Sequence, residues 1–235
     1  MVPAYRILSL ILFPILYAYT ALVVFILIIL SWLRADGLIR IISRRWAQSV
    51  FLLMFKRLPV IGREHIRKEE KHIVVANHAS LFDIVAIMSV YPGIAWFGHE
   101  RLLKVPVFNH FLKRTGYVPV RKPSVTNTRQ MIGHLMENSS DKSVALFPEG
   151  TRTTDGKINS FYRGFIYLLR SRDVDILPVT LNGFYSLKPK NRSYINFRSR
   201  LGIVIHPPIP REHLASMDDR QIIETVKTVI ESSYN

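Results

Sequence analysis

The sequence contains no cysteine among its 235 residues. Disulfide bonds, thiolate metal sites and a cysteine nucleophile are therefore excluded. The absence fits a domain that faces a reducing compartment, where disulfides are rare. No internal repeat or low-complexity tract interrupts the chain, so we expect the soluble part to be a single domain.

Acidic residues are scarce: 17 aspartates and glutamates stand against 32 lysines and arginines, which gives a net charge of +15. Such an excess attracts polyanions, which include nucleic acid, an anionic membrane surface and phosphate-bearing substrates. Nucleic-acid binding would also require a recognition motif or aromatic side chains gathered to stack on bases, and the sequence shows neither. We therefore expect no nucleic-acid partner.

Several sequence signatures of enzymes are also absent. There is no G-x-x-x-x-G-K-[ST] or G-x-G-x-x-G loop for a nucleotide phosphate, and no G-x-S-x-G elbow for a serine nucleophile. The eight histidines show no metal-ligand spacing such as H-E-x-x-H. A nucleotide loop and a histidine metal cluster are therefore not indicated.

A long apolar run without charge lies near the N-terminus. Residues 7–33 form a stretch of 27 uncharged residues. As a helix they would extend roughly 40 Å, against about 30 Å for the hydrocarbon core of a bilayer. One tilted span fits this length, and a break at Pro14 into two half-embedded helices is an alternative. A cleaved signal peptide would have a shorter apolar region and a small-residue cleavage site, so we predict a retained membrane anchor.

Basic residues indicate on which side of the membrane the chain continues. Only Arg6 precedes the run, whereas four arginines follow it closely, at positions 34, 40, 44 and 45. If the segment spans, the positive-inside rule places the rest of the chain on the cytoplasmic side. The next apolar stretch, residues 44–57, is too short to span. It is either an interfacial helix on anionic lipid or a helix packed on the globular core. We predict an integral or monotopic membrane protein.

Apolar strands alternate with helical segments from about residue 60 onward. Strands are predicted at 72–76, 94–98, 117–120, 143–148 and 176–183, a strand or hairpin at 193–209, and helices at 81–90, 105–116, 124–138, 163–172 and 218–232. This alternation predicts an α/β fold with a mostly parallel or mixed sheet flanked by helices. The sheet would follow the N-terminal membrane-embedded helical segment. The anchor and interfacial segment would occupy residues 1–58, and the α/β domain residues 59–235.

Two polar clusters each follow a predicted apolar strand. The cluster "NHASLFD" (77–83) follows the strand at 72–76, and "FPEGTR" (147–152) ends the strand at 143–148. In such sheets, ligands bind beyond the carboxyl ends of the strands. We therefore expect the two clusters to form one shared site.

His78 and Asp83 stand five residues apart, a spacing that would turn them away from each other on one continuous helix. They can meet if His78 lies in the turn before the helix and Asp83 in its first turn. In one interpretation, Asp83 only completes a capping box with Ser80. In the other, Asp83 orients the His78 imidazole, which takes a proton from an attacking hydroxyl. That hydroxyl would belong to the substrate, with Ser80 as a weaker candidate nucleophile.

The second cluster offers groups that can bind phosphate and hydroxyls. Arg152 can hold a phosphate through its planar guanidinium, and Glu149 can accept hydrogen bonds from hydroxyls. Arg121 and Lys122 follow the strand predicted at 117–120 and can add two cations. The alternative is a surface turn with an ion pair between Glu149 and Arg152, and a solvated basic pair at Arg121 and Lys122.

The order of these motifs resembles the glycerolipid acyltransferase family, in particular the 1-acyl-sn-glycerol-3-phosphate acyltransferases (PlsC-like, lysophosphatidic acid acyltransferases). The motif N-H-x-x-x-x-D comes first, at Asn77, His78 and Asp83, followed by "GYVPVRK" (116–122), "FPEGTR" (147–152) and "ILPV" (176–179). The first and third motifs at this separation are the specific ones. In "SFYRG" (160–164), Tyr162 stands where the family usually has a lysine, and Arg163 follows it.

The resemblance implies acyl transfer from acyl-CoA or acyl-carrier protein to the free hydroxyl of lysophosphatidic acid, giving phosphatidic acid. It implies that His78 is the general base and that Asp83 orients it. The implied acceptor site is lined by Glu149, Gly150, Thr151 and Arg152, with Arg121 or Lys122 helping to hold the phosphate. No metal or redox cofactor is implied, because the acyl donor is a co-substrate.

The motifs leave the acceptor open. Glycerol 3-phosphate, another lysophospholipid and an amino-acid lysolipid are alternatives to lysophosphatidic acid. A basic membrane-binding protein that uses the fold without catalysis is the alternative from another class. The expected partners are the lysophospholipid acceptor, the acyl donor (acyl-carrier protein among the candidates) and anionic membrane lipid.

Overall fold

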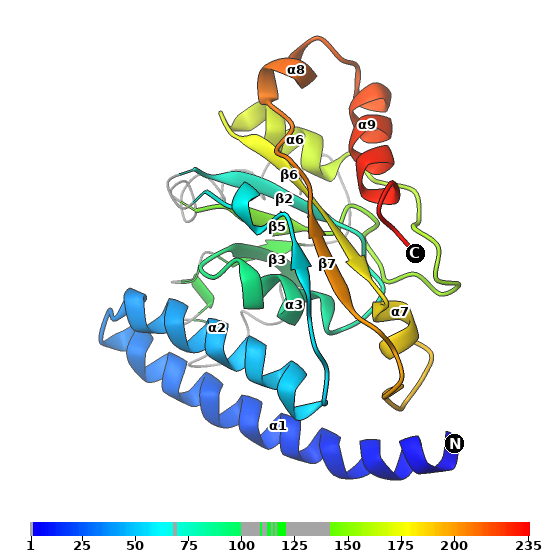
Figure 1. Cartoon of the computed structure of the whole chain (residues 1–235). Helices are drawn as coiled ribbons and strands as arrows, with labels where there is room; N and C mark the ends of the chain where they lie inside the picture. Colours follow the sequence, from blue (N-terminus) through cyan, green and yellow to red (C-terminus); the bar gives the residue numbers. More distant parts are fainter. Residues whose placement is uncertain are drawn as a thin grey trace.

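The computed structural model describes residues 2–67, 70–99, 109, 112–113, 115, 117–120 and 142–235. Among the described residues, a seven-stranded mixed sheet forms the centre of the molecule (Figure 1). The helix predicted at 124–138 lies outside the described residues, as does most of the helix predicted at 105–116.

The order of the strands across the sheet differs from their order in the chain. In space they run β1 (Val60–Ile61), β7 (Gly202–Ile205), β6 (Asp175–Asn182), β2 (His72–Ala76), β5 (Val144–Leu146), β3 (Ala95–His99) and β4 (Val118–Val120). The strands from β6 to β4 are parallel to one another, whereas β7 is antiparallel to β6 and parallel to β1. The prediction of an α/β fold with a mixed sheet is confirmed.

Strand β2 is buried along its whole length. Its side chains alternate between the two faces of the sheet: Ile73 and Val75 pack in one hydrophobic cluster, Val74 and Ala76 in the other. A strand covered on both faces is apolar at nearly every position, and in β2 only the first residue, His72, is polar. For this reason the bounds of β2 could be predicted from the apolar run alone.

Helices cover both faces of the sheet (Figure 1). On one face lie α3 (Asp83–Val90) and α2 (Asp36–Leu53); on the other lie α6 (Gly164–Ser171), α8 (Arg211–Ala215) and α9 (Asp219–Glu231). The short α7 (Phe184–Leu187) follows β6, and a 3-10 turn, η1 (Arg63–His65), precedes β2. A capping box between Asp218 and Gln221 fixes the start of α9.

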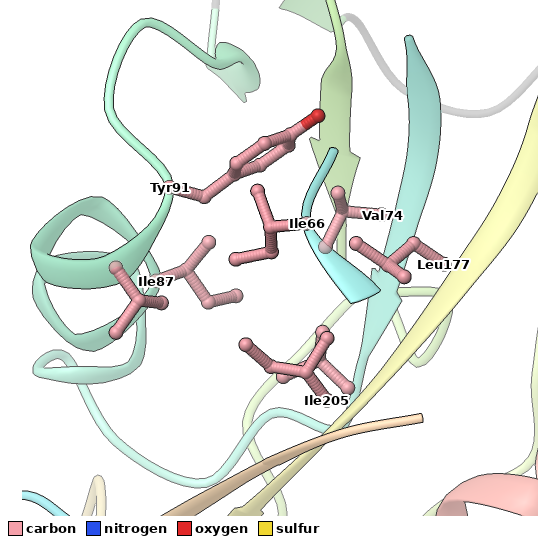
Figure 2. Close-up of a pocket in the computed structure, with 8 residues that line it drawn as sticks. Ile66, Val74, Ile87, Tyr91, Leu177 and Ile205 are labelled. Carbon is pink, nitrogen blue, oxygen red and sulfur yellow. The ribbon is translucent and has the colours of Figure 1, made fainter. Parts of the chain in front are cut away.

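A small apolar cavity lies between α3 and the sheet (Figure 2). Its walls come from α3, from the residues just after η1 and α3, and from three strands: Ile66, Val74, Ile87, Val90, Tyr91, Leu177, Val179 and Ile205. Its volume is about 10 Å³, and a site of that size admits about one water molecule, which needs polar partners. An apolar lining of this kind indicates a dry packing defect under α3.

The N-terminal helix α1 (Val2–Trp32) runs without a break, so the predicted alternative of a break at Pro14 is wrong. It is long and apolar enough to cross a membrane, and its 31 residues extend roughly 46 Å. The apolar residues that α1 buries recur four or seven positions apart, at Leu12, Leu16, Val23 and Leu27, which places them on one face of the helix. This stripe packs against α2, which returns alongside α1 as the second arm of a helical hairpin (Figure 1).

Helix α2 begins at Asp36, earlier than the stretch predicted at 44–57. Its buried residues Ala47, Val50 and Phe51 belong to the core cluster that includes α3, so one face of α2 is a core-packing face. Its other face exposes Ile41 and Leu52. An interfacial role for that exposed face stays a prediction.

The segment predicted as a strand or hairpin at 193–209 is a strand only over β7. Side chains that are distant in sequence hold residues 195–199 as a loop instead. The ammonium of Lys56 donates to the carbonyls of Phe197 and Ser199 at 2.8 and 2.7 Å, and Ile195 N–H donates to the hydroxyl of Ser9 at 2.9 Å. These hydrogen bonds occupy backbone N–H and carbonyl groups that would bond to the neighbouring strand in a hairpin.

Candidate active site

The two polar clusters meet at one edge of the sheet. Strands β2 and β5 are parallel neighbours, with Val75 opposite Leu146, so both clusters follow the same edge. The N–H of His78 donates to Glu149 Oε1 at 2.6 Å, and the N–H of Thr153 donates to the carbonyl of His78 at 2.9 Å. The structure therefore joins "NHASLFD" and "FPEGTR", as the sequence predicted.

His78 and Asp83 are in direct contact. The imidazole Nδ1 lies 2.8 Å from Asp83 Oδ2, and the N–H groups of Ala79 and Ser80 donate to the same oxygen at 2.6 and 2.7 Å. Asp83 is fully buried, whereas the His78 side chain is 17% exposed. Burial raises the pKa of Asp83, and the hydrogen bonds from His78, Ser80 and Ala79 oppose that rise.

The predicted capping box is formed only in part. Asp83 Oδ2 accepts the N–H of Ser80, but α3 begins at Asp83 with Phe82 as its N-cap, and the Ser80 hydroxyl oxygen accepts the N–H of Phe82 at 3.4 Å instead of that of Asp83. Asp83 Oδ2 also contacts His78 Nδ1. The turn thus holds the carboxylate where it can orient His78. Ser80 itself is fully buried, and its hydroxyl donates to the carbonyl of Lys188 at 2.8 Å, which disfavours Ser80 as a nucleophile.

The His78 ring lies flat against Phe147, with centroids 4.0 Å apart and planes 10° apart, and Trp96 stacks on Phe147 at 5.8 Å. Sequence patterns alone did not single out Phe147 as a site residue. The signal that could have identified it is its position directly after β5 and before Pro-Glu-Gly. With Nδ1 bound to Asp83 and the ring plane fixed by Phe147, Nε2 is the nitrogen left for a substrate.

Glu149 has a different position from the one expected of an acceptor ligand. It is 2% exposed, and its oxygens accept the N–H groups of His78 at 2.6 Å and Asn159 at 2.8 Å. Burial raises the pKa of Glu149, and the two backbone N–H groups oppose that rise. This geometry favours a structural role for Glu149, in which its carboxylate links the "FPEGTR" turn to the His78 backbone, over direct contact with a substrate hydroxyl.

Gly150 and Thr151 are exposed at the tip of the turn. Gly150 has φ +66°, and a Cβ there would lie 3.2 Å from the Tyr162 ring, so a glycine fits best. Tyr162 therefore borders the turn at the position where the family usually has a lysine. Arg163 points elsewhere, with one guanidinium nitrogen 3.9 Å from Asp219 Oδ2 on α9.

Arg152 is half-buried beside Thr153, whose N–H donates to the carbonyl of His78. The ion pair between Glu149 and Arg152 that the sequence left open is not formed among the described residues. The guanidinium is therefore available to an anionic ligand. Arg121 and Lys122 lie outside the described residues, and their expected phosphate contact stays a prediction.

Asn77 fastens the histidine turn to the sheet. Its amide nitrogen donates to the carbonyl of Leu181 at 3.0 Å, and its oxygen accepts the N–H of Leu181 at 2.8 Å. Leu181 belongs to β6, so these two buried hydrogen bonds hold the residue after β2 against β6. Within the described part of the chain, no group of three histidine, aspartate or glutamate side chains is placed to hold a metal ion.

Comparison with known proteins points to one family. A model of the acyltransferase family matches residues 57–182, more than half of the chain. The crystal structure of the 1-acyl-sn-glycerophosphate acyltransferase PlsC from Thermotoga maritima superposes with a TM-score of 0.82 at 26% identity. It covers 97% of this chain and 95% of that one. Its fold matches the sheet and the N-terminal helices described above.

Two curated relatives show the range of the similarity. A 1-acyl-sn-glycerol-3-phosphate acyltransferase of Borreliella burgdorferi is 28% identical over 186 residues, which are 74% of this chain and 73% of that protein. A chloroplastic 1-acyl-sn-glycerol-3-phosphate acyltransferase of Arabidopsis thaliana is 26% identical over 170 residues, which are 72% of this chain and 48% of that protein. The chain thus spans about half the length of its plant relatives.

Proposed function

Because the chain belongs to the acyltransferase family, we propose that it transfers an acyl group to the free hydroxyl of lysophosphatidic acid, giving phosphatidic acid. The acyl donor is acyl-CoA or acyl-carrier protein. The observation that carries the proposal is the contact between His78 and buried Asp83, at the same sheet edge as the cation of Arg152. The relatives named as 1-acyl-sn-glycerol-3-phosphate acyltransferases support the choice of acceptor.

The first step is attack by the acceptor hydroxyl on the donor thioester. His78 Nε2 takes the hydroxyl proton as the oxygen forms its bond to the thioester carbon. The Nδ1–H group donates to Asp83 Oδ2 throughout, which fixes the tautomer and stabilises the imidazolium that forms.

In the second step the tetrahedral intermediate collapses. The carbon–sulfur bond breaks, and the imidazolium returns its proton to the leaving thiolate, so that the free thiol departs and His78 is again neutral. No covalent acyl-enzyme forms, since the nucleophile is supplied by the substrate. This agrees with a Ser80 hydroxyl that is buried and bonded to a backbone carbonyl.

The acceptor is held through its phosphate. Arg152 binds phosphate oxygens through its guanidinium, and Arg121 or Lys122 adds a further cation. Gly150 and Thr151 border the acceptor at the exposed tip of the turn. Glu149 acts indirectly, by fixing the His78 backbone and the turn. No metal ion or redox cofactor takes part in this scheme.

The N-terminal helices attach the enzyme to the membrane that holds its lipid acceptor. Large apolar side chains on α1 stay exposed, among them Leu10 at 75% and Trp32 at 66%, and an apolar surface of this extent is stable against lipid. The excess of basic residues also favours binding to anionic head groups. Residues 1–58 would form this attachment, with residues 59–235 as the catalytic domain on the cytoplasmic side.

The test is transfer of a radiolabelled acyl group in detergent micelles, with acyl-CoA and acyl-carrier protein as donors in parallel. Lysophosphatidic acid, glycerol 3-phosphate and lysophosphatidylcholine are offered as separate acceptors. We expect labelled phosphatidic acid as the main product, with a kcat/KM for lysophosphatidic acid well above those for the other acceptors. A preference for glycerol 3-phosphate or lysophosphatidylcholine would contradict the proposed acceptor, and transfer to none would contradict the activity.

A further inference from the structure

A third segment reaches the sheet edge that carries the two polar clusters. Strand β6 lies next to β2 on the side opposite β5 and runs parallel to both. Its carboxyl end at Asn182 leads through α7 to Lys188. The Ser80 hydroxyl donates to the carbonyl of Lys188 at 2.8 Å, across 108 positions of sequence. The backbone of Lys188 is thereby held against Ser80, two residues along the chain from His78.

The ammonium of Lys188 is directed by the segment that follows it. It donates to the carbonyl of Arg192 at 2.6 Å, which uses one of its three protons and leaves two for a ligand. Arg192 is itself held: its guanidinium donates to the carbonyl of Ser186 and lies 5.1 Å from the Tyr194 ring. The amino acids around Lys188 thus form a fixed turn.

Lys188 shares its surroundings with two other cations. Burial lowers the pKa of Lys188, and the charges of Arg152 and Arg192 lower it further. Lys188 and Arg152 are half-buried, and among the described residues neither is in an ion pair with a carboxylate. Like charges that gather in a partly desolvated place repel one another and destabilise the unliganded site. A doubly charged anion would remove that repulsion.

We propose that Lys188 is a ligand for the phosphate of the acceptor and binds it together with Arg152. The inference rests on the proposed function, because it names a residue that selects the acceptor in the same site. A phosphate monoester carries close to two negative charges at neutral pH and accepts several hydrogen bonds, which matches a free guanidinium on one side and two ammonium protons on the other. The phosphate thus bridges the segments that follow β5 and β6. The free hydroxyl of the acceptor, which is the group to be acylated, then lies toward His78.

The same geometry gives Lys188 a part in specificity. An acceptor without phosphate, such as a monoacylglycerol, leaves the cations of Lys188 and Arg152 unpaired, so its transition state lacks their stabilisation. Lys190, two positions along, is exposed and serves as a matched basic control on the same segment.

The experiment compares Lys188→Met, Lys188→Arg and Lys190→Met with the full-length wild-type enzyme in detergent micelles. Steady-state kinetics are measured with lysophosphatidic acid and with monoacylglycerol. For Lys188→Met we expect the KM for lysophosphatidic acid to rise roughly 10- to 100-fold, the range for a lost charged hydrogen bond. The preference for lysophosphatidic acid over monoacylglycerol, as a ratio of kcat/KM values, should fall by a similar factor. Lys188→Arg should recover most of this loss, and Lys190→Met should match wild type.

An unchanged KM and an unchanged acceptor preference in Lys188→Met would overturn the inference, as would an equal effect of Lys190→Met. Calorimetric titration with short-chain lysophosphatidic acid separates the inference from the proposed function. If the wild type binds the lipid but makes no phosphatidic acid, the proposed activity fails, and a loss of binding in Lys188→Met still supports the phosphate site. If the wild type does not bind the lipid, both fail. Melting temperatures of all variants identify a folding defect. If Lys188→Met has such a defect, recovery of the KM in Lys188→Arg supports the phosphate contact, and no recovery contradicts it.

Discussion

The imidazole of His78 lies parallel to the phenyl ring of Phe147, with 4.0 Å between the centroids and 10° between the planes. Asp83 holds the ring by one nitrogen, which leaves rotation about that hydrogen bond, and Phe147 blocks that rotation. The segments that follow two neighbouring strands therefore determine the orientation of one side chain: His78 follows β2, and Phe147, against which it packs, follows β5.

Replacing Phe147 by leucine should lower kcat about tenfold, because a catalytic ring that is free to rotate spends less time in the reactive orientation. The KM for lysophosphatidic acid should change little, since Phe147 is not placed among the phosphate ligands. Steady-state kinetics on Phe147→Leu and Phe147→Tyr test this, and the tyrosine variant, which keeps the stacked ring, should retain most activity. An equal loss in both variants would contradict a role based on stacking.

Replacing Glu149 by glutamine should destabilise the protein by about 1–3 kcal/mol, because an amide group leaves one of two buried N–H donors without an acceptor. The donors at stake are the N–H groups of His78 and Asn159. Thermal melting in detergent, followed by tryptophan fluorescence, measures the loss. Glu212→Gln on α8 is the control, since Glu212 is exposed. A Glu149→Gln variant that melts with the wild type would contradict the bracing role.

Replacing Arg152 by alanine should chiefly raise the KM for lysophosphatidic acid, by roughly tenfold or more, since a charged hydrogen bond to phosphate is lost. The KM for acyl-CoA should stay close to the wild-type value. Initial rates with each substrate varied in turn give both constants. An unchanged acceptor KM together with poorer use of the acyl donor would assign Arg152 to the donor instead.

Stability should fall as the pH drops below about 6.5, because two buried histidines are neutral in the folded chain. Burial lowers the pKa of both His206 and His72 from the usual value of 6.5. The unfolded chain binds protons at these positions before the folded chain does. Above about pH 6.5 these histidines therefore leave the free energy of unfolding unchanged. As the pH falls from there toward the folded pKa values, the free energy of unfolding decreases, by about 1.4 kcal/mol for each unit of pKa difference.

The contacts of His206 place a proton on its Nε2. The Thr180 hydroxyl donates to the carbonyl of Ile230 at 2.6 Å, so its oxygen accepts from His206 Nε2, 2.8 Å away. A glutamine at position 206 keeps a donor and cannot titrate. Melting temperatures at pH 7.5, 6.5 and 5.5 should fall less steeply for His206→Gln than for wild type. Parallel curves would rule out a contribution from His206.

Local patterns were enough to predict much of the sheet and the position of the two polar clusters. Strand β2 and the cluster after it are continuous in sequence, and burial on both faces makes such a strand apolar at nearly every position. The contacts that complete the site join residues far apart in sequence. Ser80 meets Lys188, and Lys56 meets Phe197 and Ser199, and no periodicity in a single sequence encodes such pairs. The same contacts explain why residues 193–201 do not form the expected strand.

The most direct test of the account is the acyl-transfer rate of His78→Ala with acyl-CoA and lysophosphatidic acid. It is measured beside the wild type and a His213→Ala control, whose histidine is exposed on α8. The account predicts that His78→Ala loses at least about a hundredfold in kcat, the scale of general-base catalysis, with its melting temperature close to that of the wild type, while His213→Ala keeps full activity. A His78→Ala enzyme that transfers acyl groups as fast as the wild type would show that the histidine and aspartate form only a capped turn.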